Sequence, residues 1–194
     1  MSEIPGVEYL WSIIKEHSPE EVSIRTGVET FEKGYAVVCM GRRYEINVDN
    51  KSISGPEGPI PDLLLLSYLA RAKNVPPSDE WITPGEVPGG DVFFQGPHAL
   101  PTAGLAKRFG DDSEGFRNAS KLIGGVPLEF GDASSSFLVL PRIRIGLVLW
   151  MRDEEFRPEV KVMFDRTIAI HLPLDVILAL VGFVGSVFLA ATEE

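Results

Sequence analysis

Residues 137–150 read FLVLPRIRIGLVLW, and the second half of this stretch, Ile143–Trp150, decides the fold. Its side chains alternate with period two, which puts residues 143, 145, 147 and 149 on one face of a strand and the other four on the opposite face. Both sets are mostly apolar, so we expect a strand that is covered on both sides. The polar loop at 152–158 suits a hairpin connection, which predicts antiparallel pairing with the next apolar run, at 160–164.

Further strands and helices are predicted on both sides of this stretch. Apolar runs at 126–130 and 137–140 indicate two more strands, and a period-two pattern with a short connection indicates a β-hairpin over 35–48. Helices are expected at 7–15, 18–27, 62–73, 102–109 and 112–123. The order of the elements favours a single α+β domain over residues 1–194, with a mostly antiparallel sheet, flanking helices and a buried C-terminal helix.

That C-terminal helix corresponds to the run at 176–191, which is almost entirely apolar. Its sixteen residues are fewer than the roughly 20 that a membrane-spanning helix needs, and no Lys or Arg flanks it. The N-terminus lacks the basic and apolar regions of a signal peptide, and the single cysteine, Cys39, excludes an intrachain disulfide. We therefore expect no membrane anchor and a cytoplasmic location.

The formal net charge of −10 argues against nucleic acid as a partner. Binding to a phosphate backbone requires a basic surface that releases counterions, whereas 28 Asp and Glu residues outnumber 18 Lys and Arg residues here. The local motifs of phosphate-binding loops, dinucleotide-binding folds, zinc proteases, serine hydrolases and EF-hands are missing from the sequence. The absence of these motifs argues against the common enzyme classes but does not exclude an enzyme of another kind. The sequence identifies no cofactor.

Polar side chains meet apolar sequence at the junction between the last predicted strand and the last predicted helix. Asp165 ends the strand, and His171 lies just before Pro173, which suits the first turn of a helix. A carboxylate, an imidazole and free helix N–H groups can converge there, and the helix N-terminus would lower the pKa of His171 and favour the neutral form of a general base. The alternative is that Asp165 pairs with Arg142 or Arg144 across strands while His171 only hydrogen-bonds a backbone carbonyl.

Arg142 is the second unusual residue, because it lies between Pro141 and Ile143 in apolar surroundings. An arginine in such a setting needs a carboxylate or a bound anion, and strand order makes Asp132 and Asp165 its candidate partners. The histidines lack the spacing that is typical of a metal site, so no metal is assigned. The candidate ligand-binding residues are Asp132, Arg142, Asp165, His171 and His98.

Several short motifs are spread along the chain from about Leu10 onward. They are Pro88-Gly89-Gly90 with Phe94 and His98, Phe109-Gly110, Gly131-Asp132-Ala133, Pro141-Arg142-Ile143, Leu149-Trp150 with Asp153-Glu154-Glu155-Phe156, Phe164-Asp165 and His171-Leu172-Pro173. In this order they resemble an uncharacterised domain-of-unknown-function family of anaerobic bacteria and archaea. Some members carry an additional cysteine-rich segment like those that bind iron–sulfur clusters in corrinoid and one-carbon metabolism. The resemblance implies an intracellular role in anaerobic metabolism, with any cluster supplied by a partner, because this chain has only Cys39.

The leading hypothesis is a non-catalytic binding or accessory module for a small anionic ligand or a partner metalloprotein. The ligand or partner is expected near Asp132, Arg142, Asp165 and His171. The alternative is an enzyme that uses Asp165 and His171 as an acid–base pair on a small substrate. A third reading is a structural protein that binds a partner through Val92-Phe93-Phe94 or through the C-terminal helix. An enzyme requires a concave pocket with His171 and a carboxylate in hydrogen-bond reach, whereas an accessory protein can present a flat apolar patch.

Overall fold

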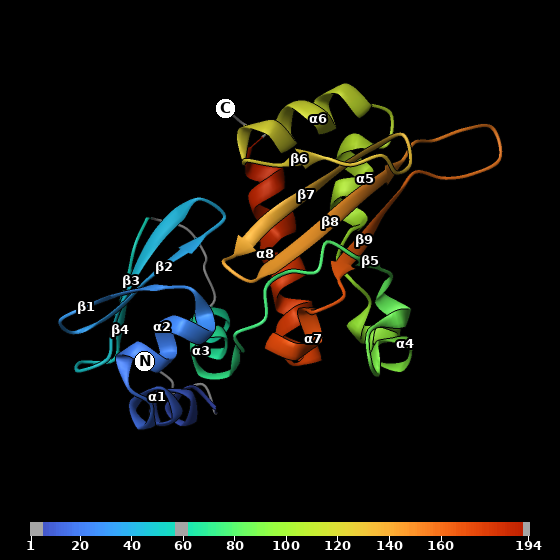
Figure 1. The fold of residues 1–194 in the computed structure, drawn as a ribbon. Helices are drawn as coiled ribbons and strands as arrows, with labels where there is room; N and C mark the ends of the chain where they lie inside the picture. Colours follow the sequence, from blue (N-terminus) through green and yellow to red (C-terminus); the bar gives the residue numbers. More distant parts are fainter. Residues whose placement is uncertain (1–5, 57–61, 192–194) are drawn as a thin grey trace.

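The computed structural model describes residues 6–56 and 62–191, which form two antiparallel sheets with flanking helices (Figure 1). The first part of the chain contains α1 (Val7–Glu16), α2 (Pro19–Thr26) and a sheet of four strands in the order β1-β2-β3-β4. Its strands are β1 (Glu29–Phe31), β2 (Gly34–Cys39), β3 (Arg42–Asn47) and β4 (Ser52–Ser54). The predicted hairpin over 35–48 is therefore confirmed as β2 and β3, the centre of this sheet.

The second sheet has five strands in the order β5-β9-β8-β7-β6, and every neighbouring pair is antiparallel. Its strands are β5 (Trp81–Ile82), β6 (Val126–Pro127), β7 (Ala133–Leu140), β8 (Ile143–Trp150) and β9 (Glu159–Asp165). The helices are α3 (Asp62–Arg71), α4 (Gly90–Phe93), α5 (Ala103–Phe109), α6 (Ser113–Leu122), α7 (Ile168–His171) and α8 (Leu174–Ala190), with short 3-10 helices η1 (Pro84–Glu86) and η2 (Gly96–His98). The predicted α+β class with antiparallel strands is confirmed.

Local signals explain why the first elements begin and end where they do. The Ser18 side chain accepts a hydrogen bond from the Glu21 N–H, and Gly27 closes α2 with a φ of 74° that an L-residue with a side chain rarely adopts. Met40 and Gly41 join β2 to β3 with φ angles of 47° and 75°. Two consecutive positive φ angles are typical of the two-residue turn whose twist matches a hairpin.

The core of the second sheet lies between its inner face and α8. The inner face of β8 consists of Ile143, Ile145, Leu147 and Leu149, each at most 1% exposed. In Figure 1, α8 crosses behind β7 and β8. Phe188 of α8 lies at the centre of this layer, with its ring centroid within 6 Å of those of Phe109, Phe116 and Phe137. This packing confirms the predicted period-two pattern of β8 and the predicted burial of the C-terminal helix. No helix in the described ranges is long and apolar enough to cross a membrane.

Strands β6 and β7 differ from their predicted bounds. The strand expected at 126–130 is only Val126–Pro127, and the strand expected at 137–140 begins at Ala133 and includes Ser134, Ser135 and Ser136. These three serines are polar and precede the apolar run, so they fell outside the predicted strand. The Ser134 hydroxyl donates to Leu128 O and accepts from the Phe130 N–H, so its burial in the strand leaves no unsatisfied group.

The two sheets are joined through α3, which packs against both α1 and α8, and through the hydrogen bond from Met40 N to Val139 O at 3.0 Å.

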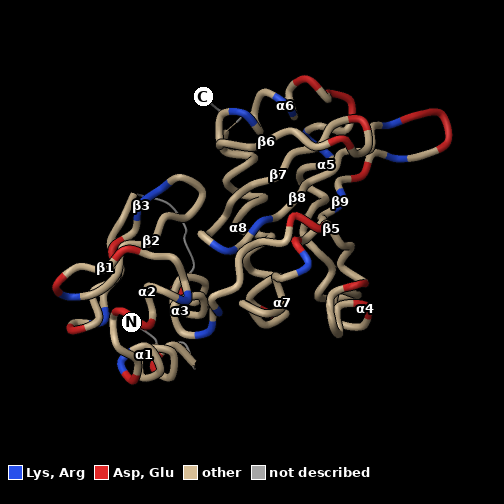
Figure 2. The backbone as a smooth tube through the Cα atoms, viewed as in Figure 1, with Lys and Arg blue, Asp and Glu red and all other residues tan. Residues whose placement is uncertain are grey.

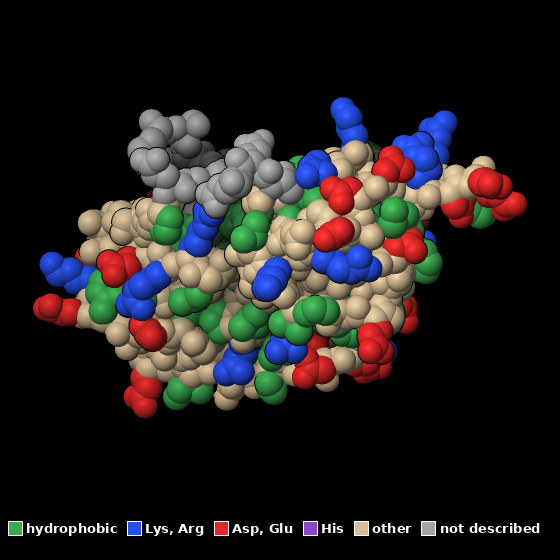
Figure 3. Space-filling model, turned by 90° about the horizontal axis from the view of Figure 1, so that it is seen from above, with side chains coloured by type: hydrophobic (Ala, Val, Ile, Leu, Met, Phe, Trp, Pro, Cys, Tyr) green, Lys and Arg blue, Asp and Glu red, His purple; other side chains and the backbone are tan. Residues whose placement is uncertain are grey.

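The loop between β8 and β9 projects from the sheet (Figure 1). Acidic residues gather at its tip (Figures 2 and 3). Phe156 in the same loop is 68% exposed.

We expect Phe188→Ala to lower the free energy of unfolding by about 3–5 kcal/mol, because it empties the centre of the aromatic layer. The measurement is urea denaturation followed by circular dichroism. Phe156→Ala is the matched control, since this ring is mostly in solvent, and it should change stability by less than about 0.5 kcal/mol. Equal effects for the two variants would contradict the assignment of the core.

Candidate functional site

Asp165, at the end of β9, is a buried carboxylate that is fully engaged by hydrogen-bond donors. The backbone N–H groups of Ser78, Asp79 and Thr167 donate to its two oxygens at 3.1, 2.8 and 2.9 Å, and the hydroxyls of Ser78 and Thr167 donate at 3.1 and 2.6 Å. Burial raises the pKa of Asp165, but the hydrogen bonds outweigh it, so the pKa lies below its usual value. Asp165 therefore ties the segment before β5 to the start of α7.

His171 is the last residue of α7 and is 1% exposed. Its Nδ1 accepts a hydrogen bond from Lys73 N at 3.3 Å, which puts the proton of the neutral ring on Nε2. Burial lowers the pKa of His171, and the charge of Arg142 acts in the same direction while Asp165 opposes it. The pKa of His171 is thus shifted downward, the direction that the sequence suggested, but the main cause is burial and not a helix N-terminus. Nε2 is buried and has no hydrogen-bond partner among the described residues.

Arg142 follows β7 and caps the C-terminal end of α2. Its Nε donates to Arg25 O at 3.1 Å, and its Nη2 donates to Ile24 O at 3.1 Å and to Asn74 Oδ1 at 2.8 Å. The Arg142 N–H also donates to the Tyr68 hydroxyl at 3.0 Å. A guanidinium at the carbonyl end of a helix is stabilised by the helix dipole, so these contacts take the place of the expected carboxylate.

A cavity of about 430 Å³ lies beside His171, between α3, α7 and the start of α8. Arg71 and Lys73 contribute to its lining, together with apolar residues such as Ile13 and Leu172. Both basic side chains are exposed, and neither forms an ion pair with another described residue. The cavity wall thus combines two available cations with a neutral imidazole.

Arg25 approaches the same segment from α2. Its Nη1 donates to Ala72 O at 3.0 Å, whereas Nε and Nη2 are buried without a partner among the described residues. Burial lowers the pKa of Arg25, although Glu21 and Tyr35 act in the opposite direction. Basic residues therefore surround the end of α3 from three elements (Figure 2), in a protein with a net charge of −10.

The other predicted site residues are elsewhere in the fold. Asp132 accepts from Met151 N at 2.7 Å beside the end of β8, which is the opposite end of the sheet from Asp165. His98 stacks on Phe93, with ring centroids 4.7 Å apart. The structure therefore brings Arg142, Asp165 and His171 to one region and leaves Asp132 and His98 out of it. Among the described residues, no group of three His, Cys, Asp or Glu side chains is placed to hold a metal ion.

Two pairings that the sequence suggested take another form. Arg144 pairs with Asp79 rather than with Asp165, and His171 accepts from a backbone N–H rather than donating to a carbonyl. Sequence reasoning missed Arg25, Arg71 and Lys73 altogether. Their only signal was a position at the ends of two predicted helices, and nothing in the sequence shows that these helix ends meet.

All residues described at this site except Ile13 lie in the part of the chain that one family model matches. The model, described as a domain of unknown function (DUF3786), matches residues 18–186. The chain belongs to the DUF3786 family. No curated protein and no solved structure matches the chain, so the DUF3786 assignment confirms a family of unknown function and transfers no activity.

We expect Asp165→Asn to lower the free energy of unfolding by about 3 kcal/mol at pH 7, because the amide nitrogen would face N–H donors. The difference should shrink as the pH falls through the lowered folded-state pKa of Asp165, where the native carboxylate also becomes protonated. Urea denaturation at several pH values measures both effects. Asp79→Asn is the control, since this exposed side chain forms only a surface ion pair and should change stability by less than about 1 kcal/mol.

The titration of His171 predicts a second dependence of stability on pH. The folded protein keeps this ring neutral, whereas the unfolded chain takes up a proton near pH 6.5, so stability falls as the pH drops from about 6.5 towards the lowered folded-state pKa. His171→Gln should remove this contribution. A constant difference in unfolding free energy between wild type and variant from pH 8 to pH 5 would contradict a neutral buried His171.

Proposed function

We propose that this protein is a non-catalytic binding module that holds a small anionic ligand in the cavity beside His171. The observation that carries the proposal is that two exposed cations, Arg71 and Lys73, lie at one cavity of a strongly acidic protein and form no ion pair with any described residue. Other exposed cations, such as Lys107, also form no ion pair with a described residue, so Arg71 and Lys73 are distinguished by their shared position at one cavity. Cations that lack a carboxylate partner at a concave site are suited to an anion from solution.

The chemistry of the lining supports an anion with several oxygens. A guanidinium can bind two oxygens of a carboxylate or phosphate in one plane, and an ammonium adds a second positive charge on a flexible stem. Arg25 and Arg142 lie behind the segment that carries Arg71 and Lys73, and they increase the positive potential there. Because the two lining cations are exposed, screening limits their contribution, and we expect a Kd of about 1 µM to 1 mM.

His171 supports the same ligand class through its protonation state. A neutral ring with its proton on Nε2 offers a hydrogen-bond donor to an oxygen, and a buried donor without an acceptor costs about 1–3 kcal/mol. An anion in this cavity, with a small adjustment of the ring, would remove that cost. The binding of the ligand would then stabilise the junction between α3 and α7.

The contacts of Asp165 give less support to an acid–base enzyme. A carboxylate that accepts five hydrogen bonds from backbone and hydroxyl donors is stabilised in its ionised form and is a poor proton acceptor. No hydrogen bond joins Asp165 to His171 in the described chain.

A role in anaerobic metabolism, with a metalloprotein partner, rests on the family resemblance and not on a contact of these residues.

The test is isothermal titration calorimetry with inorganic pyrophosphate and, separately, with citrate at low ionic strength. Lys73→Gln and Arg71→Gln should each weaken binding of the preferred anion about 10-fold, and His171→Ala should weaken it further. Lys107→Gln is the matched control, because Lys107 is an exposed cation on α5 outside the cavity. It should leave the affinity unchanged.

Two results would overturn the proposal. One is the absence of heat with both anions at millimolar concentration. The other is an equal loss of affinity in all four variants, which would indicate nonspecific attraction instead of a site. Far-ultraviolet circular dichroism of each variant separates lost binding from lost folding.

A further inference from the structure

The outer face of the five-stranded sheet carries a second cavity, of about 530 Å³, which shares no lining residue with the cavity beside His171. In Figure 1, α8 lies behind β7 and β8, and no labelled helix crosses their near side. The outer face of β8 includes Val148 and Trp150, and the outer face of β9 includes Lys161 and Met163. A volume of this size falls in the usual range of small-ligand sites.

Two large aromatic side chains at this cavity are only partly covered. Trp150 is 48% exposed and Phe130 is 40% exposed, although apolar groups of this size are normally buried. Phe94, Leu100 and Met163 complete an apolar wall. An exposed aromatic surface inside a concavity is suited to stacking with a flat ring system.

The backbone holds the Phe130 side of the cavity in place. Gly131 has a φ of 56°, and a Cβ at this position would lie 2.6 Å from Leu149 O and 2.8 Å from Val148 Cγ1. The loop therefore lies directly on β8, which fixes the position of the adjacent Phe130. A preformed wall lowers the entropy cost of binding a rigid ligand.

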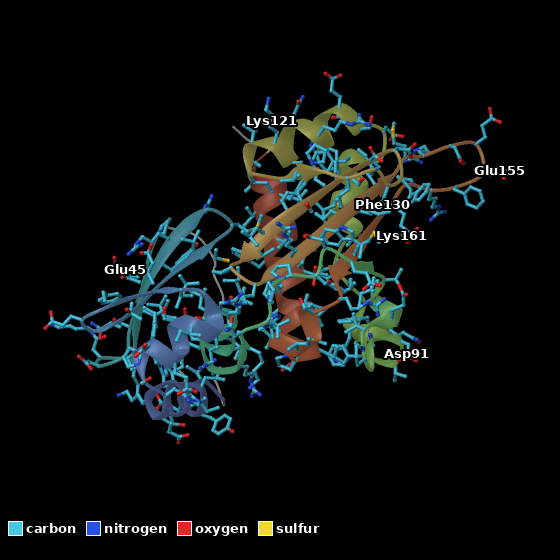
Figure 4. All side chains as sticks on the ribbon, in the orientation of Figure 1. Glu45, Asp91, Lys121, Phe130, Glu155 and Lys161 are labelled. Carbon is cyan, nitrogen blue, oxygen red and sulfur yellow. The ribbon has the colours of Figure 1, made fainter. Side chains whose placement is uncertain are left out.

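A single cation lies at the edge of this aromatic surface. Lys161 and Phe130 are neighbours in Figure 4, and both line the cavity. The Lys161 Nζ is 3.4 Å from the Glu159 Oε2, and both side chains are more than half exposed. Glu159 also lines the cavity, so an acidic group of a ligand has to replace Glu159 as the partner of Lys161. An exposed pair of this kind contributes little to stability, so this exchange costs little.

We propose that this outer cavity binds a flat aromatic ligand that carries one acidic group. The ring system lies against Phe130 and Trp150, and the acidic group pairs with Lys161. The inference is independent of the proposed anion site, because no residue is shared and the interaction is mainly apolar. The single cation distinguishes the ligand class from the multiply charged anions expected beside His171.

The probe is anilinonaphthalene sulfonate, which combines a flat aromatic system with one negative charge. We expect saturable fluorescence enhancement with one site per chain. We also expect energy transfer from tryptophan, because Trp150 lines the cavity and would lie next to the bound probe. Trp150→Ala and Phe130→Ala should each weaken the affinity at least 10-fold. Lys161→Met keeps the apolar stem, removes the charge, and should weaken it about 3- to 10-fold.

Phe156→Ala is the control, because it removes another exposed aromatic ring outside the cavity. Pyrophosphate should not compete with the probe, and Lys73→Gln should leave probe binding unchanged, so this result and the anion-site result can fail separately. Unsaturable binding, or equal affinities in wild type, Trp150→Ala and Lys161→Met, would overturn the proposal. Since Lys161 is exposed on a β-strand surface, its variant remains informative even if an aromatic variant folds poorly.

Discussion

The packing of α8 against α5, α6 and the inner face of the five-stranded sheet organises the other parts of the molecule. Burial of apolar surface is the main favourable term in folding, and this layer contains the largest aromatic cluster of the described chain. It determines which face of the sheet is inside and where α8 begins. The short α7 and the buried His171 must then fit between the end of β9 and the start of α8.

Polar contacts add to the apolar packing at the seam between the two sheets. Arg142 binds the carbonyl end of α2, Asp165 gathers N–H groups from two segments, and Tyr68 donates to Thr26 O while it accepts from Arg142 N. Charged groups in such positions lose solvation, and hydrogen bonds from oriented backbone groups compensate for part of that loss. Arg71 and Lys73 lie exposed at the surface of the seam, and within residues 6–56 and 62–191 neither has a carboxylate partner.

The two cavities differ because they lie on structurally different surfaces. The cavity beside His171 lies where helix ends meet, so it contains cations and a helix-end histidine. The outer cavity lies on the face of the sheet opposite α8, so its walls come from alternating strand side chains, the loop before β7, and Pro84 and Phe94 beside the strands. Local architecture thus decides whether charge or aromatic surface dominates each one.

Much of the local structure could be predicted because its signals are short in range. Period-two patterning determined β8, and Ser18 and Gly27 determined the ends of α2. His171 was expected just before the last helix, but it is the last residue of the separate short helix α7, and α8 begins at Leu174 after Pro173. The candidate site was only partly predictable. Asp165 and His171 lie six residues apart in the sequence, whereas Arg25 and Lys73 reach the same region from other elements.

The α+β class, the antiparallel strands and the apolar C-terminal helix could all be predicted before any coordinates, because periodicity and end signals depend on neighbours along the chain. Only the tertiary structure decided that Arg142 caps a helix, that Asp132 lies at the far end of the sheet, and that Trp150 faces solvent. The physical reason is that hydrogen-bond partners and exposure depend on which distant segments pack together. That packing is set by the summed burial of the whole core, which no local pattern specifies.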